Sequence, residues 1–518
     1  MLKAVRIFAI VAVCSAATII ALRVAFPLPA LVSETGARAQ AEPAETGLGA
    51  TLIPLAAEHP GKSGIMLLDS GVDAFATRMV LARSATASID AQYYIWQDDL
   101  TGIRLLSELQ AAALRGVQVR LLVDDNGTPA LDQELAALAA LPNAEVRIFN
   151  PFTLRGHRLL NYAFDFFRLN RRMHNKSFTV DGIVTVVGGR NIGDDYFETG
   201  TGLSFLDLDV LAVGPVARDV EADFFSYWSS GSAYPAQSLI QLQPGSETRL
   251  DDRALALRDT PQGRAYSEVV RASSLVEQIR ETTLPLEWVS TRLFSDDPAK
   301  VLGLDDGSEV MFRRLMAEIG TPESAFDIVS AYFIPGTSAA EKMVEFVESG
   351  VRVRVFTNSL EATDVVPVHA GYADYREALI SGGVDIFELR AEDVVRRTIS
   401  DLGIIELSSA ALHAKSFSID RRRAFIGSFN FDPRSKRLNT EMGLLIDSSS
   451  LASNMSDWLD ANLASIAYHV TKDSAGHMVW TTTDADETPT VFETEPNSTL
   501  PLRIMLWFIQ LLPVQWLL

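Results

Sequence analysis

The feature that most constrains this chain is a short motif that occurs twice. Both copies read H-x-K-x-x-x-x-D: the first is His174-Asn-Lys-Ser-Phe-Thr-Val-Asp181 and the second is His413-Ala-Lys-Ser-Phe-Ser-Ile-Asp420. At the same interval after each copy come a glycine and then an asparagine, in Gly188-Gly-Arg-Asn191 and in Gly427-Ser-Phe-Asn430. A lone histidine most often completes a buried strand, but that explanation does not account for two identical constellations. The motif therefore predicts a unit that has been duplicated.

The residues around the motif repeat in the same order. In each half a strand-like run is followed by a helical stretch and then by a second buried strand, which together make a βαβ unit. A third strand-like run follows in each half. The matched pairs are residues 88–95 and 326–334, 115–123 and 349–355, and 144–149 and 383–388. This alternation predicts an α/β fold with two related halves.

The length of 518 residues leaves room for two full domains. We predict a first domain over residues 61–235 and a second over 286–450, each with one copy of the motif. The other predicted segments are a signal peptide or N-terminal membrane anchor at 1–32, a flexible linker at 33–60, a connector at 236–285 and a C-terminal segment at 451–518. The linker prediction rests on a composition rich in Ala, Glu, Gly and Pro, without an apolar period.

The two ends of the chain are apolar. Lys3 and Arg6 precede an apolar run at residues 7–22, which is typical of an export signal or a short membrane anchor. Small residues near position 40 offer cleavage sites, so cleavage and retention both stay open. If the segment is retained, the positive charges before it predict a body on the outer side of the membrane.

The C-terminal tail, residues 501–518, is almost wholly apolar and carries Trp507 and Trp516. Pro513 interrupts it, and it is too short and broken to span a bilayer. Such a tail can lie in the lipid interface with its tryptophans at headgroup level, or it can dock on the protein as a core segment. We favour the interfacial position.

Charge and composition exclude several classes of protein. The net charge of −21 disfavours nucleic acid as a partner, because a phosphate backbone normally draws a protein with a basic surface. The hydrophobic content of 47% excludes disorder as the main state. Cys14 is the single cysteine, so neither a disulfide framework nor a cysteine-based metal site is expected.

The repeated residues have the chemistry that transfer at a phosphodiester requires. That reaction needs a nucleophile, a proton for the leaving alkoxide and positive charge around the phosphoryl oxygens. Two histidines, two lysines and two asparagines supply these groups without a metal ion or a cofactor, so we expect neither. The candidate catalytic residues are the His, Lys and Asp of both motif copies: His174, Lys176, Asp181, His413, Lys415 and Asp420. The sequence does not settle which histidine is the nucleophile.

At these residues the sequence resembles the phospholipase D superfamily, in which two copies of this motif meet at one active site. Beyond the motif, residues 188–197 and 427–435, together with Asn439-Thr-Glu441, are similar to bacterial cardiolipin synthases, most of all to the C type. The resemblance covers roughly residues 61–450. It implies two tandem α/β sandwich domains related by pseudo-two-fold symmetry, with one shared active site at their interface.

The resemblance also implies roles for individual residues. His174 would be the nucleophile and His413 the acid, while the lysines would hold phosphate together with Asn191, Ser428 and Asn430. Glu441 would support the histidine of the opposite half. Gly189 stands where the second copy has Ser428, so any hydroxyl contribution to phosphate binding would come from the second half alone.

The function implied is transfer of a phosphatidyl group, through a phosphohistidine, to phosphatidylglycerol, which yields cardiolipin at the bacterial inner membrane on its periplasmic or outer side. The donor, phosphatidylglycerol or phosphatidylethanolamine, stays open, as does the need for an accessory protein. One alternative is phosphodiester hydrolysis, of a lipid or, less in keeping with the charge, of a nucleic acid. Another is a membrane-tethered protein that binds phospholipid without turnover, although two intact motifs argue against it.

Overall fold

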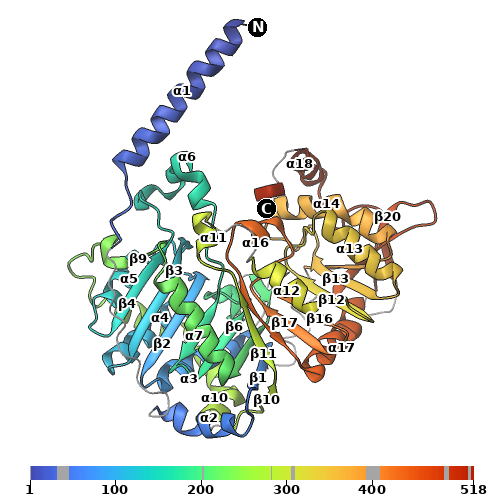
Figure 1. Cartoon of the computed structure of the whole chain (residues 1–518). Coiled ribbons are helices and arrows are strands. Elements are labelled where there is room, and N and C mark those ends of the chain that lie inside the picture. Colours follow the sequence, from blue (N-terminus) through green and yellow to red (C-terminus); the bar gives the residue numbers. More distant parts are fainter. Residues whose placement is uncertain are drawn as a thin grey trace.

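The computed structural model describes residues 2–31, 46–200, 203–281, 283–304, 310–391, 409–483, 489–511 and 515–517. Two mixed sheets stand side by side, each with helices packed on it, and helix α1 (Leu2–Ala25) projects away from the body (Figure 1). The predicted α/β class and the two related halves are confirmed.

The first sheet has nine strands in the order β10-β1-β8-β6-β5-β2-β3-β4-β9. β2, β3 and β4 are parallel, and β5 runs antiparallel beside β2. The strands are β1 (Ser63–Leu68), β2 (Ser88–Ile95), β3 (Gln118–Gly127), β4 (Ala144–Phe149), β5 (Ser177–Val180), β6 (Val184–Gly188), β8 (Asp209–Val213), β9 (Ala233–Pro235) and β10 (Glu287–Val289).

The second sheet has ten strands in the order β11-β18-β17-β16-β12-β13-β14-β19-β20-β21. Its parallel trio β12, β13 and β14 and the antiparallel neighbour β16 repeat the centre of the first sheet. The strands are β11 (Thr291–Ser295), β12 (Ala325–Ser330), β13 (Arg352–Asn358), β14 (Asp385–Leu389), β16 (Lys415–Ile419), β17 (Arg423–Gly427), β18 (Met442–Ile446), β19 (Ala467–Lys472), β20 (Met478–Thr483) and β21 (Pro489–Phe492). A parallel pair, β7 (Leu203–Leu206) with β15 (Ser409–Leu412), joins the two halves.

The helix of each βαβ unit ends at a glycine. α4 (Leu100–Leu114) begins after Asp99, whose side chain accepts a hydrogen bond from the backbone of Gly102. After α4 and after α13 (Thr337–Glu348), Gly116 and Gly350 have φ of 98° and 93°, values that favour glycine. Each glycine turns the chain directly into the next parallel strand, as the sequence predicted.

The remaining helices cover the sheets or the edges of the molecule. Those of the first half are α2 (Gly47–Ala57), α3 (Gly71–Ser84), α5 (Asp132–Ala139), α6 (Arg158–Leu169), α7 (Pro215–Trp228), α8 (Arg249–Arg258), α9 (Pro261–Ala272) and α10 (Ser274–Glu281). Those of the second half are α11 (Ala299–Leu302), α12 (Met311–Ile319), α14 (Val366–Ser381), α16 (Pro433–Arg437), α17 (Ser449–Ile466) and α18 (Leu500–Gln510).

An apolar core joins the two halves. Strands β6 and β8 of the first sheet contact β17 and β18 of the second through buried aliphatic side chains. The cluster includes Val187, Val210, Ile426, Leu444 and Ile446. Because these side chains leave water only when the halves are together, their burial at about 25 cal/mol per Å² holds the two motif copies in one body.

Several segments differ from the sequence predictions. Residues 46–57 are not a flexible linker, because Leu48 and Leu52 lie four positions apart on α2 and are buried in the first core. Residues 33–45 of the predicted linker lie outside the described residues. The connector is mostly helical, with α8, α9 and α10 packed on the first domain.

The predicted domain boundaries do not coincide with the sheets. β10, expected in the second domain, pairs with β1 in the first sheet. β19, β20 and β21 extend the second sheet well past residue 450.

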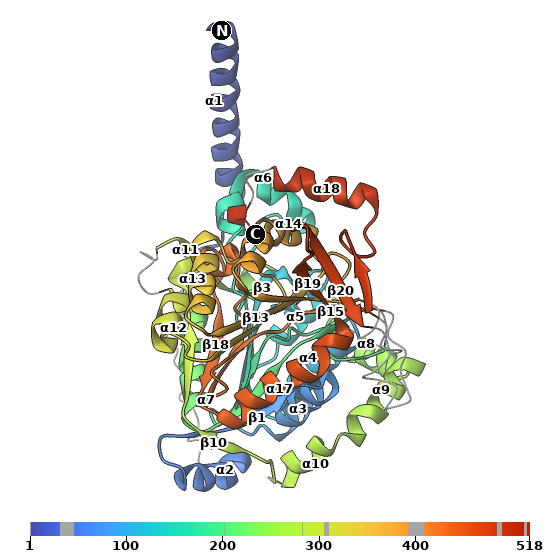
Figure 2. The same ribbon diagram turned by 90° about the vertical axis from the view of Figure 1, so that its right-hand side faces the viewer.

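The two ends of the chain lie at the same side of the molecule. α1, α6 and α18 occupy one end in both views (Figures 1 and 2). Within the part of the chain that the structure describes, no helix has the length and apolar character needed to cross a membrane. The tail docks through one face only: Leu506 of α18 is buried against Leu360 and Ala370, whereas Trp507 and Phe508 are exposed. The interruption predicted at Pro513 lies outside the described residues.

Candidate active site

The first motif histidine is held by the second half of the chain. The backbone N–H of His174 donates to the carbonyl of Thr440 at 3.0 Å. Its Nδ1 lies 2.8 Å from Oε2 of Glu441, a residue 267 positions away in the sequence. The support from Glu441 that the resemblance implied is therefore present as a direct contact. It fixes the ring, and Nε2 has no hydrogen-bond partner among the described residues.

The second motif histidine is held by the first half in the same way. The backbone N–H of His413 donates to the carbonyl of Leu206 at 2.9 Å, and its Nδ1 lies 2.5 Å from Oδ2 of Asp207. Each histidine thus contacts two consecutive residues of the opposite half, a carbonyl and then a carboxylate. The two exchanged contacts place both motif copies at one interface.

Asp207 is a site residue that was not predicted from the sequence. Its equivalence to Glu441 follows from strand register, because Gly188 pairs with Asp209 in the first sheet and Gly427 pairs with Gly443 in the second. The acid therefore stands two positions before the paired residue in both halves. The distance from the motif differs between halves, since β7 lies in the intervening segment of the first half. A search for an acid just before the strand that follows the motif would have found it.

The motif lysines lie beside the histidines and are buried. Nζ of Lys176 donates to the carbonyl of His174 at 2.6 Å, and Nζ of Lys415 donates to the carbonyl of His413. Lys415 also lies 2.9 Å from Nδ1 of His413. Burial and the nearby Lys415 lower the pKa of Lys176 to about 7, against the opposing effect of Glu441. Burial likewise lowers the pKa of Lys415. The two ammonium groups form one positive region next to both imidazoles.

Aromatic rings complete the walls around the histidines. Tyr94 meets His174 edge-on at 5.1 Å between ring centroids, and Tyr196 meets His413 in the same way at 5.1 Å. Phe205 contacts both His413 and Tyr196, with ring centroids 4.9 Å apart in each pair. These contacts restrict ring rotation and keep the site apolar outside its charged centre.

The two carboxyl groups have opposite ionisation tendencies. Burial raises the pKa of Glu441 to about 7, against the opposing effect of Lys176. Burial also acts to raise the pKa of Asp207, but His413 and Lys415 outweigh it and leave that pKa well below its ordinary value. Burial and the lysines lower the pKa of both histidines, and Asp207 opposes this at His413. The site therefore contains one carboxylate that is firmly ionised and one carboxyl that titrates near neutrality.

The predicted phosphate-binding residues fall in three different positions. The Asn191 side chain accepts from the backbone of Ile95 and donates to the Tyr196 hydroxyl at 2.9 Å, so it positions the ring beside His413. Ser428 donates to Glu441 at 2.5 Å and thus acts through that carboxyl. Oδ1 of Asn430, a hydrogen-bond acceptor, is buried without a partner among the described residues.

Gly189 allows the close approach of Asp207. A Cβ at this position would overlap the Asp207 carboxylate, so a serine like Ser428 does not fit there. Gly189, which departs from the family pattern, is thus accompanied by a different group at this position. The first half places a carboxylate where the second half has a hydroxyl.

The structure does not bring the motif aspartates into this site. Asp181 occupies a tight turn at φ 54° and accepts hydrogen bonds from the backbone of Ala87 and Ser88, each at 2.9 Å. Asp420 is equivalent, with the same φ and bonds to the backbone of Ser324 and Ala325. Both fix the start of a central strand, which corrects the catalytic role predicted for them.

Comparisons with known proteins agree with this arrangement. Residues 80–228 and 315–463 each match the sequence model of the family described as cardiolipin synthase, PLD-like domain. The chain belongs to this family. It is 44% identical over 471 residues to cardiolipin synthase C of Escherichia coli K12, covering 91% of this chain and 99% of that one. It is 27% identical over 403 residues to cardiolipin synthase A of Pseudomonas syringae, covering 77% and 69%.

A solved structure shares the fold. The phosphatidylserine synthase of Haemophilus influenzae Rd KW20 superimposes with a TM-score of 0.54, covering 90% of this chain and 100% of that one, at 15% identity. The membership of the phospholipase D superfamily that the repeated motif predicted is confirmed, as is the tandem pair of domains.

Proposed function

We propose that this protein transfers a phosphatidyl group between lipids through a covalent phosphohistidine, with phosphatidylglycerol as the acceptor and cardiolipin as the product. The observation that carries the proposal is the exchange of contacts between halves, which sets two differently supported histidines and two buried lysines around one position. Family membership supports the same reaction, since relatives that are 44% and 27% identical are named cardiolipin synthases.

In the first step Nε2 of His174 attacks the donor phosphorus. The contact of Nδ1 with Glu441 leaves the Nε2 lone pair free, and the lowered pKa keeps the ring neutral. A P–N bond forms, the bond from phosphorus to the headgroup oxygen breaks, and protonated His413 gives that oxygen its proton. Lys176 and Lys415 stabilise the charge that develops on the phosphoryl oxygens.

In the second step the acceptor hydroxyl of phosphatidylglycerol replaces the departed headgroup. His413, now neutral, takes the hydroxyl proton while the oxygen attacks phosphorus and the P–N bond to His174 breaks. The ionised Asp207 stabilises the imidazolium that His413 becomes. Both histidines return to their starting state, so the cycle needs no metal ion or cofactor.

The donor and the acceptor can be identified by product analysis. Purified protein is incubated in vesicles with isotopically labelled phosphatidylglycerol, alone or with phosphatidylethanolamine. We expect label in cardiolipin, together with free glycerol or ethanolamine from the donor. Label in phosphatidic acid alone would favour the hydrolase alternative, and no release in either mixture would leave only a binding role and contradict the proposal.

We propose further that the end carrying α1, α6 and α18 contacts the membrane, with the catalytic body on the periplasmic side. Arg23 of α1 donates to the carbonyl of Phe164 in α6 at 2.8 Å, so these helices are joined. All three expose large apolar side chains: Phe8, Ile10, Val13, Ile20 and Val24 of α1, Leu159, Leu160 and Phe167 of α6, and Ile504, Trp507, Phe508 and Leu511 at α18. A patch of this kind on one end fits a lipid surface.

This end also lies beside the site. Tyr162 of α6 donates to Asn126, which donates to Tyr94 at 3.0 Å, and the Tyr94 ring packs on His174. A membrane at α6 would therefore bring lipid headgroups next to the nucleophile.

The membrane contact predicts a selective loss. Replacing Leu159, Leu160 and Phe167 by serine, or Trp507 and Phe508 by serine, should lower vesicle binding and lipid turnover about tenfold or more, because apolar burial at about 25 cal/mol per Å² is lost. Turnover of a short-chain soluble phosphodiester should not change. Trp458, exposed on α17 away from this end, supplies the matched control Trp458→Ser. Parallel loss on both substrates, with a lowered melting temperature, would contradict the membrane role.

A further inference from the structure

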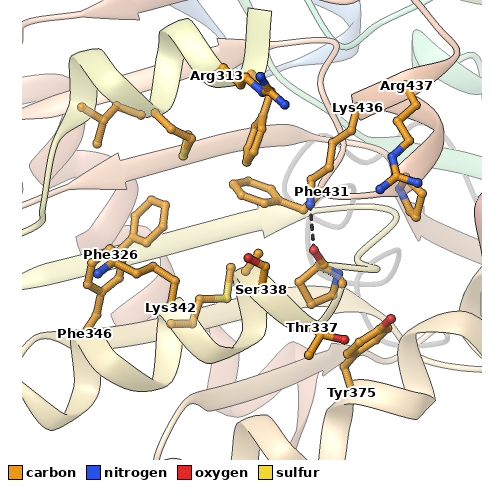
Figure 3. A pocket seen from close by; sticks show the side chains of 18 of the residues that line it. Arg313, Phe326, Thr337, Ser338, Lys342, Phe346, Tyr375, Phe431, Lys436 and Arg437 are labelled. Atoms are coloured by element: carbon orange, nitrogen blue, oxygen red, sulfur yellow. Dashed lines mark hydrogen bonds between the residues drawn. The ribbon is translucent and has the colours of Figure 1, made fainter. Parts of the chain in front are cut away.

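A large cavity lies in the second domain, apart from the catalytic residues. It has a volume of about 1250 Å³ and is formed by α12, α13 and α16, with the C-terminal segment at one end. Neither motif histidine lines it. Figure 3 shows its side chains pointing into the space between α12 and α13, over the strand that carries Phe326. We call it the α12–α13 cavity.

The base of this cavity is apolar, and its walls combine apolar side chains with polar ones such as Lys342 and Ser338. Phe326, Met343 and Phe431 are buried at its base, and the helices on either side add more aromatic and methionine side chains. The apolar lining consists of Phe312, Met316, Ile319, Phe326, Met343, Phe346 and Phe431. An apolar lining in a cavity of this volume fits a flexible hydrocarbon chain, and methionines adapt to irregular occupants.

The end of the cavity near α16 is cationic. Nζ of Lys436 donates to the carbonyl of Pro335 at 2.7 Å and lies 5.0 Å from the centre of the Phe312 ring. Arg313 and Arg437 line the same end, and neither has an ion-pair or hydrogen-bond partner in the described part of the chain. Burial lowers the pKa of Lys436 to about 8, so it stays charged at neutral pH. Three cations therefore face a common space, and no acidic side chain of the described residues lines this cavity.

A second cavity continues the cationic end. It has a volume of about 340 Å³, shares Arg313, Lys436 and Arg437 with the first, and adds Arg171 and Lys300. The charged region thus extends from the second domain towards Arg171, three residues before His174.

We propose that the α12–α13 cavity binds an anionic phospholipid, with an acyl chain in the apolar slot and the headgroup phosphate at Lys436, Arg437 and Arg313. A free phosphate would use the cations but not the apolar lining, and an apolar peptide would leave three charges unmatched. Gln510 and Leu511, at the end of α18, line the cavity. Its opening therefore adjoins the helix with the exposed Trp507 and Phe508, from which a membrane lipid would enter.

The site would hold lipid next to the catalytic centre. α16 spans Pro433–Arg437, so Lys436 and Arg437 belong to the same short helix as Arg434. Arg434 donates to the backbone carbonyl of Asn170 and is one of the cations that lower the pKa of His174. This proposal shares with the proposed function only the class of ligand, since it uses none of the catalytic groups.

Photocrosslinking tests the site directly. Full-length protein carrying His174→Ala, which prevents turnover, is mixed in detergent with phosphatidylglycerol that has a photoreactive acyl chain, and labelled peptides are mapped by mass spectrometry. We expect label on peptides containing Met316 or Met343. The double variant Arg313→Gln with Arg437→Gln should reduce that label about tenfold, while label in the catalytic cleft stays constant. Arg422→Gln, which removes an exposed arginine elsewhere on the second domain, is the matched control.

Two outcomes would overturn the proposal: label confined to the catalytic cleft, or equal labelling by the zwitterionic phosphatidylcholine analogue. Melting temperatures of all variants separate lost binding from lost folding. Failure of the proposed function would appear differently, as absence of labelled cardiolipin in the turnover assay while labelling of the cavity persists.

Discussion

The two halves of the molecule carry the same motif but support it differently. In the first half Gly189 makes room for Asp207, which is ionised and holds His413. In the second half Ser428 donates to Glu441, whose buried carboxyl titrates near neutrality and holds His174. Because a firm negative charge favours imidazolium and a weaker one leaves imidazole neutral, the supports make two equal histidines unequal. Duplication of the motif explains why there are two histidines, and the different carboxyl groups explain why, in the proposed reaction, one acts as nucleophile and the other as acid.

The residues around Asp207 in the first sheet also differ from those around Glu441 in the second. Asp209, two positions after Asp207, is buried and forms an ion pair with Arg78, with 2.9 Å between Nη2 and Oδ2. The backbone N–H of Arg190 also donates to the Asp209 carboxylate. The equivalent of Asp209 in the second sheet is Gly443, which packs against the Phe425 ring. Arg190 helps to lower the pKa of Asp207, and Lys300 acts on Glu441 in the same direction, but at Glu441 burial outweighs the nearby cations. The asymmetry is therefore built into the sheets as well as the site.

Removing the histidines tests the division of roles most severely. His174→Ala and His413→Ala should each lower lipid transfer by about 10³-fold or more, because each removes a role that the other cannot fill. With a p-nitrophenyl phosphodiester, whose leaving group needs no proton, His413→Ala should still accumulate a phosphorylated His174 detectable by mass spectrometry. His174→Ala should not. A phosphoryl group found on His413 instead would reverse the assignment.

The acids should differ in the same assay. Asp207→Asn should lower kcat about 10²-fold or more, by analogy with the loss of the orienting carboxylate in other histidine catalysts. Glu441→Gln should cost about tenfold, because Glu441 is neutral for part of the time. Asp207 raises the pKa of His413, so its removal lowers that pKa further and shifts the alkaline limb of the rate profile to lower pH. Profiles of kcat/KM against pH measure both effects. Equal losses in the two variants, with no shift of the alkaline limb, would contradict the different roles of the two acids.

Exchanging the small residues beside the acids should give smaller effects. Gly189→Ser introduces a side chain that displaces the Asp207 carboxylate, and we expect about a tenfold loss of kcat with little change in KM. Ser428→Gly removes one hydrogen bond to Glu441, worth about 1 kcal/mol, and should cost less. Steady-state kinetics with melting temperatures distinguish a moved carboxylate from an unfolded protein. A larger loss in Ser428→Gly would contradict the ranking.

The motif aspartates should affect stability and leave kcat unchanged. Asp181→Ala leaves buried backbone donors of Ala87 and Ser88 without an acceptor and should destabilise by about 2–3 kcal/mol. Asp420→Ala should cost about 1 kcal/mol, because the donors around it are more exposed. Denaturant unfolding gives the free energies, and assays well below the melting temperature give kcat. A strong loss of kcat in folded protein would return these residues to the active site.

The motif predicted the histidines and lysines of the site and the resemblance predicted Glu441, whereas neither predicted Asp207. His174, Lys176, His413 and Lys415 are found together in the structure, as their repeated spacing indicated. Asp181 was assigned to catalysis because it shares the motif, but it lies at the far end of a strand, where its neighbours are backbone donors. Shared spacing reports a shared local structure and does not tell a reacting group from one that holds a turn.

The sequence by itself determined the duplication, the α/β class and the local motif residues, because these depend on short-range periodicity and on repeated identity. The tertiary structure decided the partner of His413, which is Asp207, 206 residues away in the chain, while Glu441 as the partner of His174 was implied by the resemblance. It also decided the burial that separates the ionisation of Asp207 from that of Glu441. Loops of unequal length bring those acids to equivalent strand positions, and pKa depends on what surrounds a group in space. Neither is recorded in the spacing of residues along the chain.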